Sequence, residues 1–156
     1  TKKTSNMTFK LSQRSLDRLS GVDSNLVAVV KRAIEVTKVD FGVIEGFRTI
    51  ERQQELVDKG VSQTMKSKHL GGEAVDLVAY IGPRVSWELN LYDDIADAMK
   101  QAAMELGVAV RWGGAWTTSN ICEWQGTMEQ AMTNYIDMRR LQNRRPFIDG
   151  PHFELV

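Results

Sequence analysis

The sequence predicts an α+β domain whose small, mostly antiparallel sheet is flanked by helices. Stretches with helical periodicity and short β-rich runs are mixed along the chain. The β-rich runs lack the regular strand–helix–strand spacing of a parallel sheet. A composition of 42% hydrophobic and 26% charged residues over 156 positions is ordinary for a soluble globular protein. We therefore expect residues 1–156 to form a single domain of this class.

The first half of the sequence predicts two helices with a strand between them. Residues 23–25 are helix N-cap types, and apolar residues then keep helical spacing from Leu26 to about Thr37. Gly60 is suited to end a second, more polar helix. The predicted elements are a helix over 26–37, a strand over 41–47, a helix over 49–59 and a loop over 61–70.

The second half of the sequence predicts two further helices and three strands. Pro83 breaks the stretch after the first of these strands. Asn90 is suited to cap an amphipathic helix that Gly107 ends. The predicted elements are strands over 74–80, 108–112 and 152–156, helices over 91–106 and 126–142, a turn at 113–114 and a loop over 115–125.

The charge balance argues against nucleic acid as a partner. Lys plus Arg equals Asp plus Glu at 20 each, so no net field draws the chain to a polyanion. One local basic cluster is interpreted as a solvated helix face and loop rather than an anionic contact, because short charge runs are usually surface. This cluster consists of Arg139, Arg140, Arg144 and Arg145.

The single cysteine and the lack of a recognisable secretory signal narrow the class of protein and its expected compartment. Cys122 is the only cysteine, which excludes an intramolecular disulfide and a multi-cysteine metal site. Residues 1–6 are polar and lack the apolar core of a secretory signal. No stretch approaches the ~20 apolar residues of a membrane span. We expect synthesis in the cytoplasm, with a separate release step if the protein acts outside the cell.

Two histidines and one carboxylate are candidate metal ligands. His69 and His152 are the only histidines, and each alone is more often a surface or hydrogen-bonded core residue. Asp76 lies between Val75 and Leu77 in an apolar run, where a buried carboxylate is costly unless it is paired or metal-bound. Two imidazoles and one carboxylate suffice for a catalytic Zn²⁺ that keeps one position open for water.

Strand geometry indicates how these side chains could meet. The Gly71–Gly72 pair permits a close turn that folds His69 back towards Asp76. Alternate residues of a strand share a face, so His152 and Glu154 should point together while their neighbours pack inward. The two distant segments could thus contribute to one site.

Three motifs resemble those of zinc D-alanyl-D-alanine peptidases, which belong to a fold group with hedgehog and lysostaphin-type proteins. Ser67-x-His69-x-x-Gly72-x-Ala74-x-Asp76 resembles their S-x-H-x-x-G-x-A-x-D signature. Asp149-x-x-His152 resembles the closing acidic-x-x-His motif, and the segment 46–49 (Gly-Phe-Arg-Thr) resembles a G-[YF]-R-[ST] element followed by a frequent Gln, here Gln53.

Within this group, the chain is most similar to phage endolysins that cut the L-alanyl-D-glutamate bond of peptidoglycan. The small size, the Asp at position 149 and the segment 111–116 (Arg-Trp-Gly-Gly-Ala-Trp) carry this resemblance. The last resembles a W-G-G-D-W element, although Ala115 replaces its Asp. Residues 117–147 match no element of the family.

The resemblance implies a role for each candidate residue. His69, Asp76 and His152 would bind one Zn²⁺, and Asp149 would be the general base, with Glu154 as the rival base. Arg48 would bind a substrate carboxylate or stabilise the oxyanion. Further substrate contacts are expected from Ser67, Gln53 and Trp112, and Trp116 could act similarly, although core packing is an equal alternative for both tryptophans.

These expectations combine into one functional hypothesis. The chain would be a monomeric zinc endopeptidase, made in the host cytoplasm, that hydrolyses the L-Ala–D-Glu bond of peptidoglycan stem peptides after release. A D-alanyl-D-alanine carboxypeptidase is one alternative. A non-catalytic, zinc-containing wall-binding domain is the other.

Overall fold

An antiparallel sheet forms the centre of the computed structural model, which describes residues 8–62 and 65–156. The polar segment 1–6 and part of the predicted loop 61–70 lie outside the described residues. The strands follow the order β1-β2-β5-β4, and β3 pairs with β2. Every pairing is antiparallel, which confirms the predicted fold class. The strands are β1 Asp40–Glu45, β2 Ala74–Ile81, β3 Arg84–Ser86, β4 Val110–Trp112 and β5 His152–Leu155.

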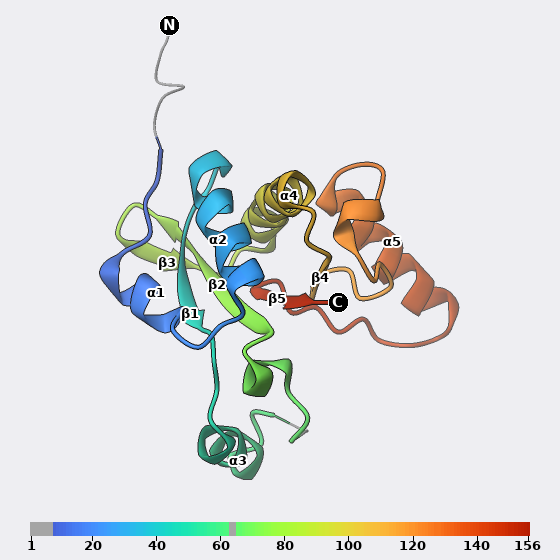
Figure 1. Ribbon diagram of the computed structural model, residues 1–156. Coiled ribbons are helices and arrows are strands. Elements are labelled where there is room, and N and C mark those ends of the chain that lie inside the picture. Colours follow the sequence, from blue (N-terminus) through green and yellow to red (C-terminus); the bar gives the residue numbers. More distant parts are fainter. Residues whose placement is uncertain (1–7, 63–64) are drawn as a thin grey trace, which may run out of the picture.

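Helices flank the sheet (Figure 1). In that view α2 and α4 lie next to each other on one side of the sheet, α3 lies at the lower end and α5 on the right. Short 3-10 turns at Lys68–Gly71 and Ile121–Glu123 interrupt the two predicted loops. No helix of the described part of the chain has the length and apolar character needed to cross a membrane. The α-helices are α1 Gln13–Arg18, α2 Ser24–Val36, α3 Ile50–Asp58, α4 Leu89–Leu106 and α5 Met128–Leu141.

The two faces of the sheet have different roles because side chains alternate along each strand. Val75, Trp112 and Phe153 are neighbours across β2, β5 and β4, and all three are completely buried in the core. Asp76 and His152 are also paired across strands, one position along, and therefore point to the opposite face. The core thus fixes the strands that carry the candidate ligands.

The stretch after β2 differs from the prediction, because Pro83 connects two strands rather than only ending one. Ile81 pairs with Arg84, which leaves Gly82 and Pro83 as a two-residue hairpin loop. Gly82 has a φ of 59°, and proline fixes a negative φ at the next position, a combination typical of a II′ turn. The Gly-Pro pair therefore builds the β2–β3 hairpin.

Two helix boundaries also differ from the prediction. Asn90 lies inside α4 instead of capping it, because Glu88 is the N-cap residue and makes no side-chain capping bond. Helix α1 was not predicted, and the Ser12 side chain caps it by accepting a hydrogen bond from the Ser15 N–H. A bulge between Val43 and Glu45 disrupts the ladder, and β1 ends before the predicted residue 47.

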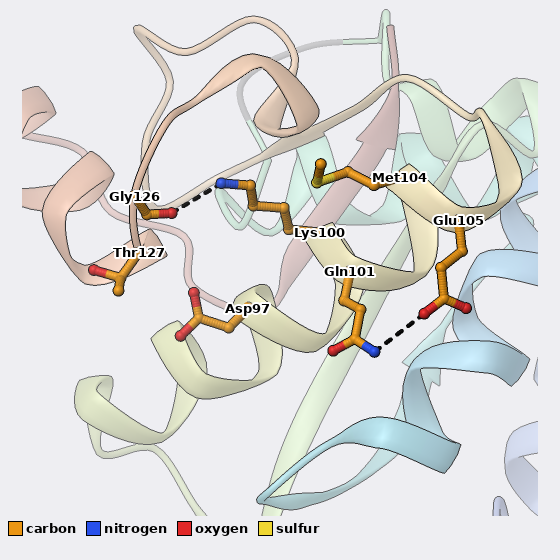
Figure 2. A pocket seen from close by; sticks show the side chains of 7 residues that line it. All are labelled: Asp97, Lys100, Gln101, Met104, Glu105, Gly126 and Thr127. Carbon is orange, nitrogen blue, oxygen red and sulfur yellow. Dashed lines mark hydrogen bonds between the residues drawn. The ribbon is translucent and has the colours of Figure 1, made fainter.

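Polar contacts join α5 to α4 around a surface pocket (Figure 2). Lys100 Nζ donates to the carbonyl oxygens of Trp124 and Gly126, the latter at 2.8 Å. The Asp97 carboxylate accepts a hydrogen bond from the Met128 N–H at 2.8 Å, which satisfies a donor in the first turn of α5. These contacts hold α5 and the loop before it in place.

Candidate metal centre

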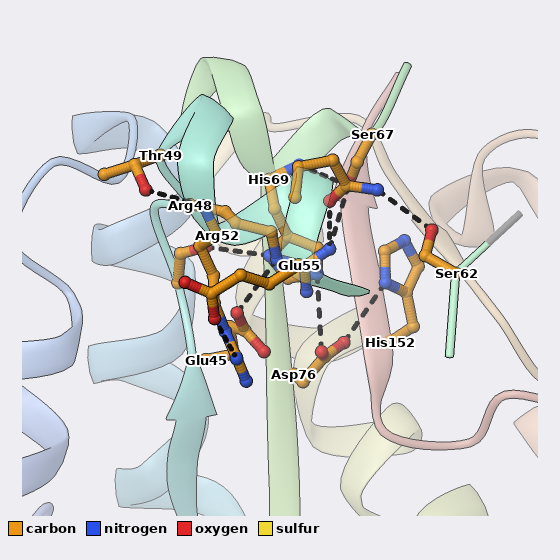
Figure 3. Close-up of polar contacts among 12 residues, drawn as sticks. Glu45, Arg48, Thr49, Arg52, Glu55, Ser62, Ser67, His69, Asp76 and His152 are labelled. Carbon is orange, nitrogen blue, oxygen red and sulfur yellow. Dashed lines mark hydrogen bonds and ion pairs between the residues drawn. The ribbon is translucent and has the colours of Figure 1, made fainter. Parts of the chain in front are cut away.

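The structure brings His69, Asp76 and His152 together at one end of the sheet. Asp76 Oδ2 lies 3.3 Å from His69 Nε2, and Asp76 Oδ1 lies 3.2 Å from His152 Nδ1. Figure 3 shows the Asp76 carboxylate between the two imidazoles. One ligand atom from each residue lies within 4.8 Å of the others. The three residues predicted from the sequence to be metal ligands therefore form one group.

Local contacts fix the position and the ring orientation of His69. Ser67 caps the Lys68–Gly71 turn by accepting a hydrogen bond from the His69 N–H at 3.2 Å. The ring's Nδ1 donates to the Gly46 carbonyl at 2.8 Å, since a carbonyl can only accept. The other ring nitrogen, Nε2, therefore faces Asp76.

Gly72 is required where the chain turns from this segment into β2. Its φ is 70°, and a Cβ at this position would lie 2.3 Å from the Gly21 carbonyl oxygen. Any side chain would therefore collide with the backbone of a neighbouring segment. The glycine of the signature motif thus allows the close approach that places His69 beside Asp76.

His152 lies between two carboxylates. Its Nδ1 faces Asp76, and its Nε2 donates to Glu154 Oε1 at 2.8 Å. Glu154 in turn lies 3.8 Å from the Lys68 ammonium group. When Nε2 carries the proton for Glu154, Nδ1 is the nitrogen available to a metal.

The pKa values of the group respond to these contacts. Burial raises the pKa of Asp76, but hydrogen bonds from His152 and His69 outweigh it and hold the pKa well below its ordinary value. Burial lowers the pKa of His152, whereas hydrogen bonds to Asp76 and Glu154 raise it, to about 9. The metal-free centre therefore favours an ionised Asp76 next to a protonated His152.

Asp149 adjoins this group from the loop before β5. Its N–H donates to the Gly113 carbonyl at 2.9 Å, and its carbonyl accepts from the His152 N–H at 3.1 Å. Burial is the main cause that raises the pKa of its carboxyl group, and the negative charge of Asp76 adds to it. Gly113 permits this approach, because a Cβ there would lie 2.3 Å from the Asp149 carbonyl oxygen. The loop thus holds a carboxyl group with a raised proton affinity beside the candidate ligands.

Arg48 and Ser67 lie next to His69 (Figure 3), and Gln53 joins them in a polar network. The Arg48 side chain donates to Glu45 Oε1 at 2.9 Å, to Gln53 Oε1 at 2.7 Å and to Ser67 Oγ at 3.4 Å. Arg48 is 8% exposed and Gln53 is completely buried. The network joins the end of β1 to α3 and to the segment that carries His69. These buried contacts therefore help to hold the His69 segment in position.

The two tryptophans occupy different environments. Trp112 is completely buried, and its indole N–H donates to the Gly150 carbonyl at 2.7 Å. Trp116 is half-buried, with its ring centroid 5.6 Å from that of His152. Ala115 between them is buried in the core and does not face the metal centre. Of the two aromatic residues, Trp116 is the one beside the candidate ligands.

The arrangement suits a divalent metal ion. Ligands about 2.0–2.1 Å from a tetrahedral zinc ion lie roughly 3.3–3.4 Å apart. Asp76 Oδ2 lies 3.3 Å from His69 Nε2 and Asp76 Oδ1 lies 3.2 Å from His152 Nδ1, so each histidine is at about this spacing from one of the two carboxylate oxygens. Two nitrogen atoms and one carboxylate oxygen also form a donor set that zinc accepts while keeping a further position open.

Comparison with known proteins gives consistent matches. A family model for phage L-alanyl-D-glutamate peptidases matches residues 7–156. The L-alanyl-D-glutamate peptidase of Escherichia phage T5 is 31% identical over 154 residues, which cover 96% of this chain and 100% of that protein. The L-alanyl-D-glutamate peptidase of Listeria phage A118 is 31% identical over 114 residues, or 71% of this chain and 40% of that protein.

A solved structure also resembles this chain over most of its length. The crystal structure of the Serratia marcescens L-Ala D-Glu endopeptidase ChiX has a TM-score of 0.70 and 38% sequence identity. The match covers 94% of this chain and 90% of that one. The fold and the similarities together define a peptidase. More narrowly, the chain belongs to the phage L-alanyl-D-glutamate peptidase family, which confirms the resemblance inferred from the sequence motifs.

Proposed function

We propose that this chain hydrolyses the L-Ala–D-Glu bond of peptidoglycan stem peptides with one zinc ion, acting as a monomeric endolysin on the cell wall. The observation that carries the proposal is the group of His69, Asp76 and His152 within a family of L-alanyl-D-glutamate peptidases. The relatives from Escherichia phage T5 and Listeria phage A118 are named for this activity.

The three residues would hold the ion through His69 Nε2, the Asp76 carboxylate and His152 Nδ1. Zinc, when bound, supplies a Lewis acid that lowers the pKa of a coordinated water towards ~7. The chain's own contribution begins with orientation. The Gly46 carbonyl fixes the His69 ring, and Glu154 fixes the His152 ring.

Asp149 is the best-placed general base. Its carboxyl group lies close enough for the charges of Asp76, His152 and His69 to act on its pKa. The rival base, Glu154, already accepts a hydrogen bond from His152 Nε2 at 2.8 Å, on the ring nitrogen that faces away from Asp76. Asp149 would therefore remove a proton from the attacking water and return it to the leaving amine.

The remaining candidates act at different distances from the substrate. Arg48 would supply positive charge near the scissile carbonyl, with Ser67 and Gln53 holding its guanidinium in place. Trp112 would act indirectly, because it is completely buried and anchors Gly150 next to Asp149. Its predicted direct contact with substrate is not favoured by this position.

A digest of purified peptidoglycan, analysed by mass spectrometry, tests the proposal. The expected products are free stem peptides that begin with D-glutamate and glycan strands that keep L-alanine. Release of D-alanine with the L-Ala–D-Glu bond intact would instead indicate a carboxypeptidase. Binding to the wall without any cleavage, at one zinc per chain, would indicate a wall-binding domain.

A further inference from the structure

A pocket next to the metal centre has an aromatic wall and two arginines. It has a volume of about 390 Å³, and its lining includes Arg111, Trp116, Tyr135, Arg139 and Phe147. Trp116 belongs to both sites, since its ring also contacts His152 with centroids 5.6 Å apart. A ligand in this Arg111/Arg139 pocket would thus lie one indole ring away from the metal centre.

The two arginines of the pocket form no ion pair among the described residues, although Arg111 is the cross-strand neighbour of Glu154 and their charges interact. The pocket lining includes no carboxylate, and neither Arg111 nor Arg139 has an acidic oxygen within 4 Å among the described residues. Arg111 uses Nε and Nη2 on the Trp116 carbonyl, and Arg139 uses the same two nitrogens on the Arg145 carbonyl. In each guanidinium, Nη1 therefore remains available for a ligand in the part of the chain that the structure describes.

Arg139 is distinct from the rest of the basic cluster. The sequence alone groups residues 139, 140, 144 and 145 as one solvated helix face and loop. In the structure Arg139 lines the pocket beside Trp116, whereas Arg140 lines a separate surface pocket with Asp137 and Leu141. Adjacent arginines of α5 therefore face different surroundings, which provides a matched pair for experiment.

The aromatic wall is held in place before any ligand arrives. Phe147 is 63% exposed, yet the Tyr135 hydroxyl donates to its carbonyl at 3.0 Å and accepts from its N–H at 2.9 Å. The Phe147 ring stacks on Trp116 with centroids 6.4 Å apart, and the Arg111 guanidinium lies 5.1 Å from the Trp116 ring centre. An exposed aromatic ring fixed in this way reduces the entropy lost on binding.

We propose that the Arg111/Arg139 pocket binds a free carboxylate of the stem peptide close to the scissile bond, with Trp116 and Phe147 packing on the adjoining apolar part. The inference rests on the proposed function. D-glutamate is a diacid, so one of its carboxyl groups can remain free when the other is used in a linkage. A carboxylate on the following residue has the same chemistry and is the second possible source.

Three synthetic peptides distinguish these sources. The first carries L-Ala–D-Glu with a free glutamate carboxylate and a second free carboxylate on the following residue. The second has the glutamate carboxylate as its amide, and the third has the following carboxylate as its amide. Steady-state cleavage is measured for the wild type, Arg139→Gln, Arg139→Lys and the matched control Arg140→Gln. Thermal midpoints verify that all variants are folded.

The expected result is a rise in KM of about tenfold for Arg139→Gln on the first peptide, with kcat changed less than about twofold. Arg139→Lys should recover part of the loss, and Arg140→Gln should match the wild type. Amidation of the carboxylate that the pocket binds should remove the difference between wild type and Arg139→Gln. Equal behaviour of Arg139→Gln and Arg140→Gln on all three peptides would overturn the inference.

The same peptides separate this inference from the proposed function. Dissociation constants are measured by calorimetry with the Asp149→Asn variant, alone and combined with Arg139→Gln. If the wild type cleaves none of the peptides, the proposed function fails, while the binding measurement still decides whether the pocket takes a carboxylate. If cleavage is normal and binding does not depend on Arg139, only the pocket inference fails.

Discussion

Asp76 and His152 are direct partners across the β2–β5 pair, so the register of these two strands sets the separation of the two candidate ligand atoms. A shift of one residue would turn one of the side chains to the opposite face of the sheet. The ladder is held by the core neighbours Val75 and Phe153, both completely buried. The hydrophobic core and the candidate metal centre are thus specified by alternate residues of the same strands.

Replacement of Asp149 should abolish turnover without removing the metal. In Asp149→Asn the carboxyl group can no longer accept a proton, and general-base catalysis contributes roughly 10²–10⁴-fold to rate. We expect a fall in kcat of this size with zinc content still near one per chain, measured by peptide cleavage and metal analysis. A variant that retains full turnover would remove Asp149 from the mechanism and return Glu154 as the candidate base.

His152→Ala should remove both zinc and zinc-dependent stability. A ligand that binds only the folded state stabilises it, by about 4 kcal/mol at a thousandfold excess over its dissociation constant. We expect the wild-type thermal midpoint to rise on zinc addition and that of the variant to stay constant. Glu154→Gln is the control, because an amide oxygen can still accept from His152 Nε2. Normal zinc binding by His152→Ala would contradict the ligand assignment.

Zinc affinity should rise with pH up to about 9. The Asp76 and Glu154 hydrogen bonds raise the pKa of His152 in the metal-free protein to about 9, and a metal can bind only the deprotonated ring nitrogen. Below that pH, zinc binding releases a proton, so the affinity should increase about tenfold per pH unit. Competition titrations between pH 6.5 and 8.5 measure how steeply zinc affinity depends on pH. A zinc affinity that does not change over this range would contradict the prediction.

The raised pKa of His152 affects the stability of the metal-free fold in the opposite direction: stability should fall as the pH rises, whereas zinc affinity should increase. A histidine whose folded pKa is raised from 6.5 to about 9 contributes stability that is complete below pH 6.5 and is lost as the pH rises towards 9. Urea unfolding in the presence of a chelator should therefore show metal-free stability decreasing over this window. The zinc-loaded protein should not show that decrease.

Arg48→Met should destabilise the fold more than Arg52→Met. Arg48 is buried, and its loss removes the guanidinium that donates to Oε1 of the completely buried Gln53 and to Oε1 of the half-buried Glu45. We expect a loss of about 2–3 kcal/mol in the free energy of unfolding. The Arg52–Glu55 ion pair is exposed, so removing it should cost less than about 1 kcal/mol. Equal losses by urea denaturation would show that the buried network adds no stability.

Asp93→Asn should stabilise the protein at neutral pH. Burial, followed by the charges of Asp94, Glu129 and Asp97, raises the pKa of Asp93 to about 6. Because the folded pKa of Asp93 lies above its unfolded value of 3.8, ionisation of this carboxyl group destabilises the fold. The protein is therefore most stable below pH 3.8 in this respect and loses that stability as the pH rises through about 6. We expect the variant to gain about 2 kcal/mol at pH 7, and the gain to shrink by about 1 kcal/mol at pH 5. A gain that does not depend on pH would contradict this origin.

The candidate ligands could be found from the sequence because their signals are local. Asp76 interrupts an apolar strand, and His69 and Gly72 belong to a motif with fixed spacing. The Gly-Pro pair at 82–83 is also a local signal, because this pair favours a two-residue hairpin turn, whereas proline considered alone predicts only the end of a strand.

Other parts of the site depend on the tertiary structure. The contacts of Arg48 with Gln53 and Ser67 bring together three elements, and no spacing in the sequence indicates them. Phe147 and Tyr135 come from a stretch without a family motif, and their hydrogen bonds join residues that are 12 positions apart in the sequence. Such pairings follow from how α5 packs on α4, which single-sequence periodicity does not determine.

β5 comes last among the strands in the sequence but lies between β2 and β4 in the sheet. Until this segment has inserted, β4 has no partner in the sheet, and His69 and Asp76 lack their third companion. Contacts between such distant parts of a chain form slowly, because loop closure costs entropy before the contacts stabilise the fold. A chain in which β5 is unpaired therefore lacks the third candidate ligand, so the candidate centre can be complete only when the last described strand is joined to β2 in one sheet.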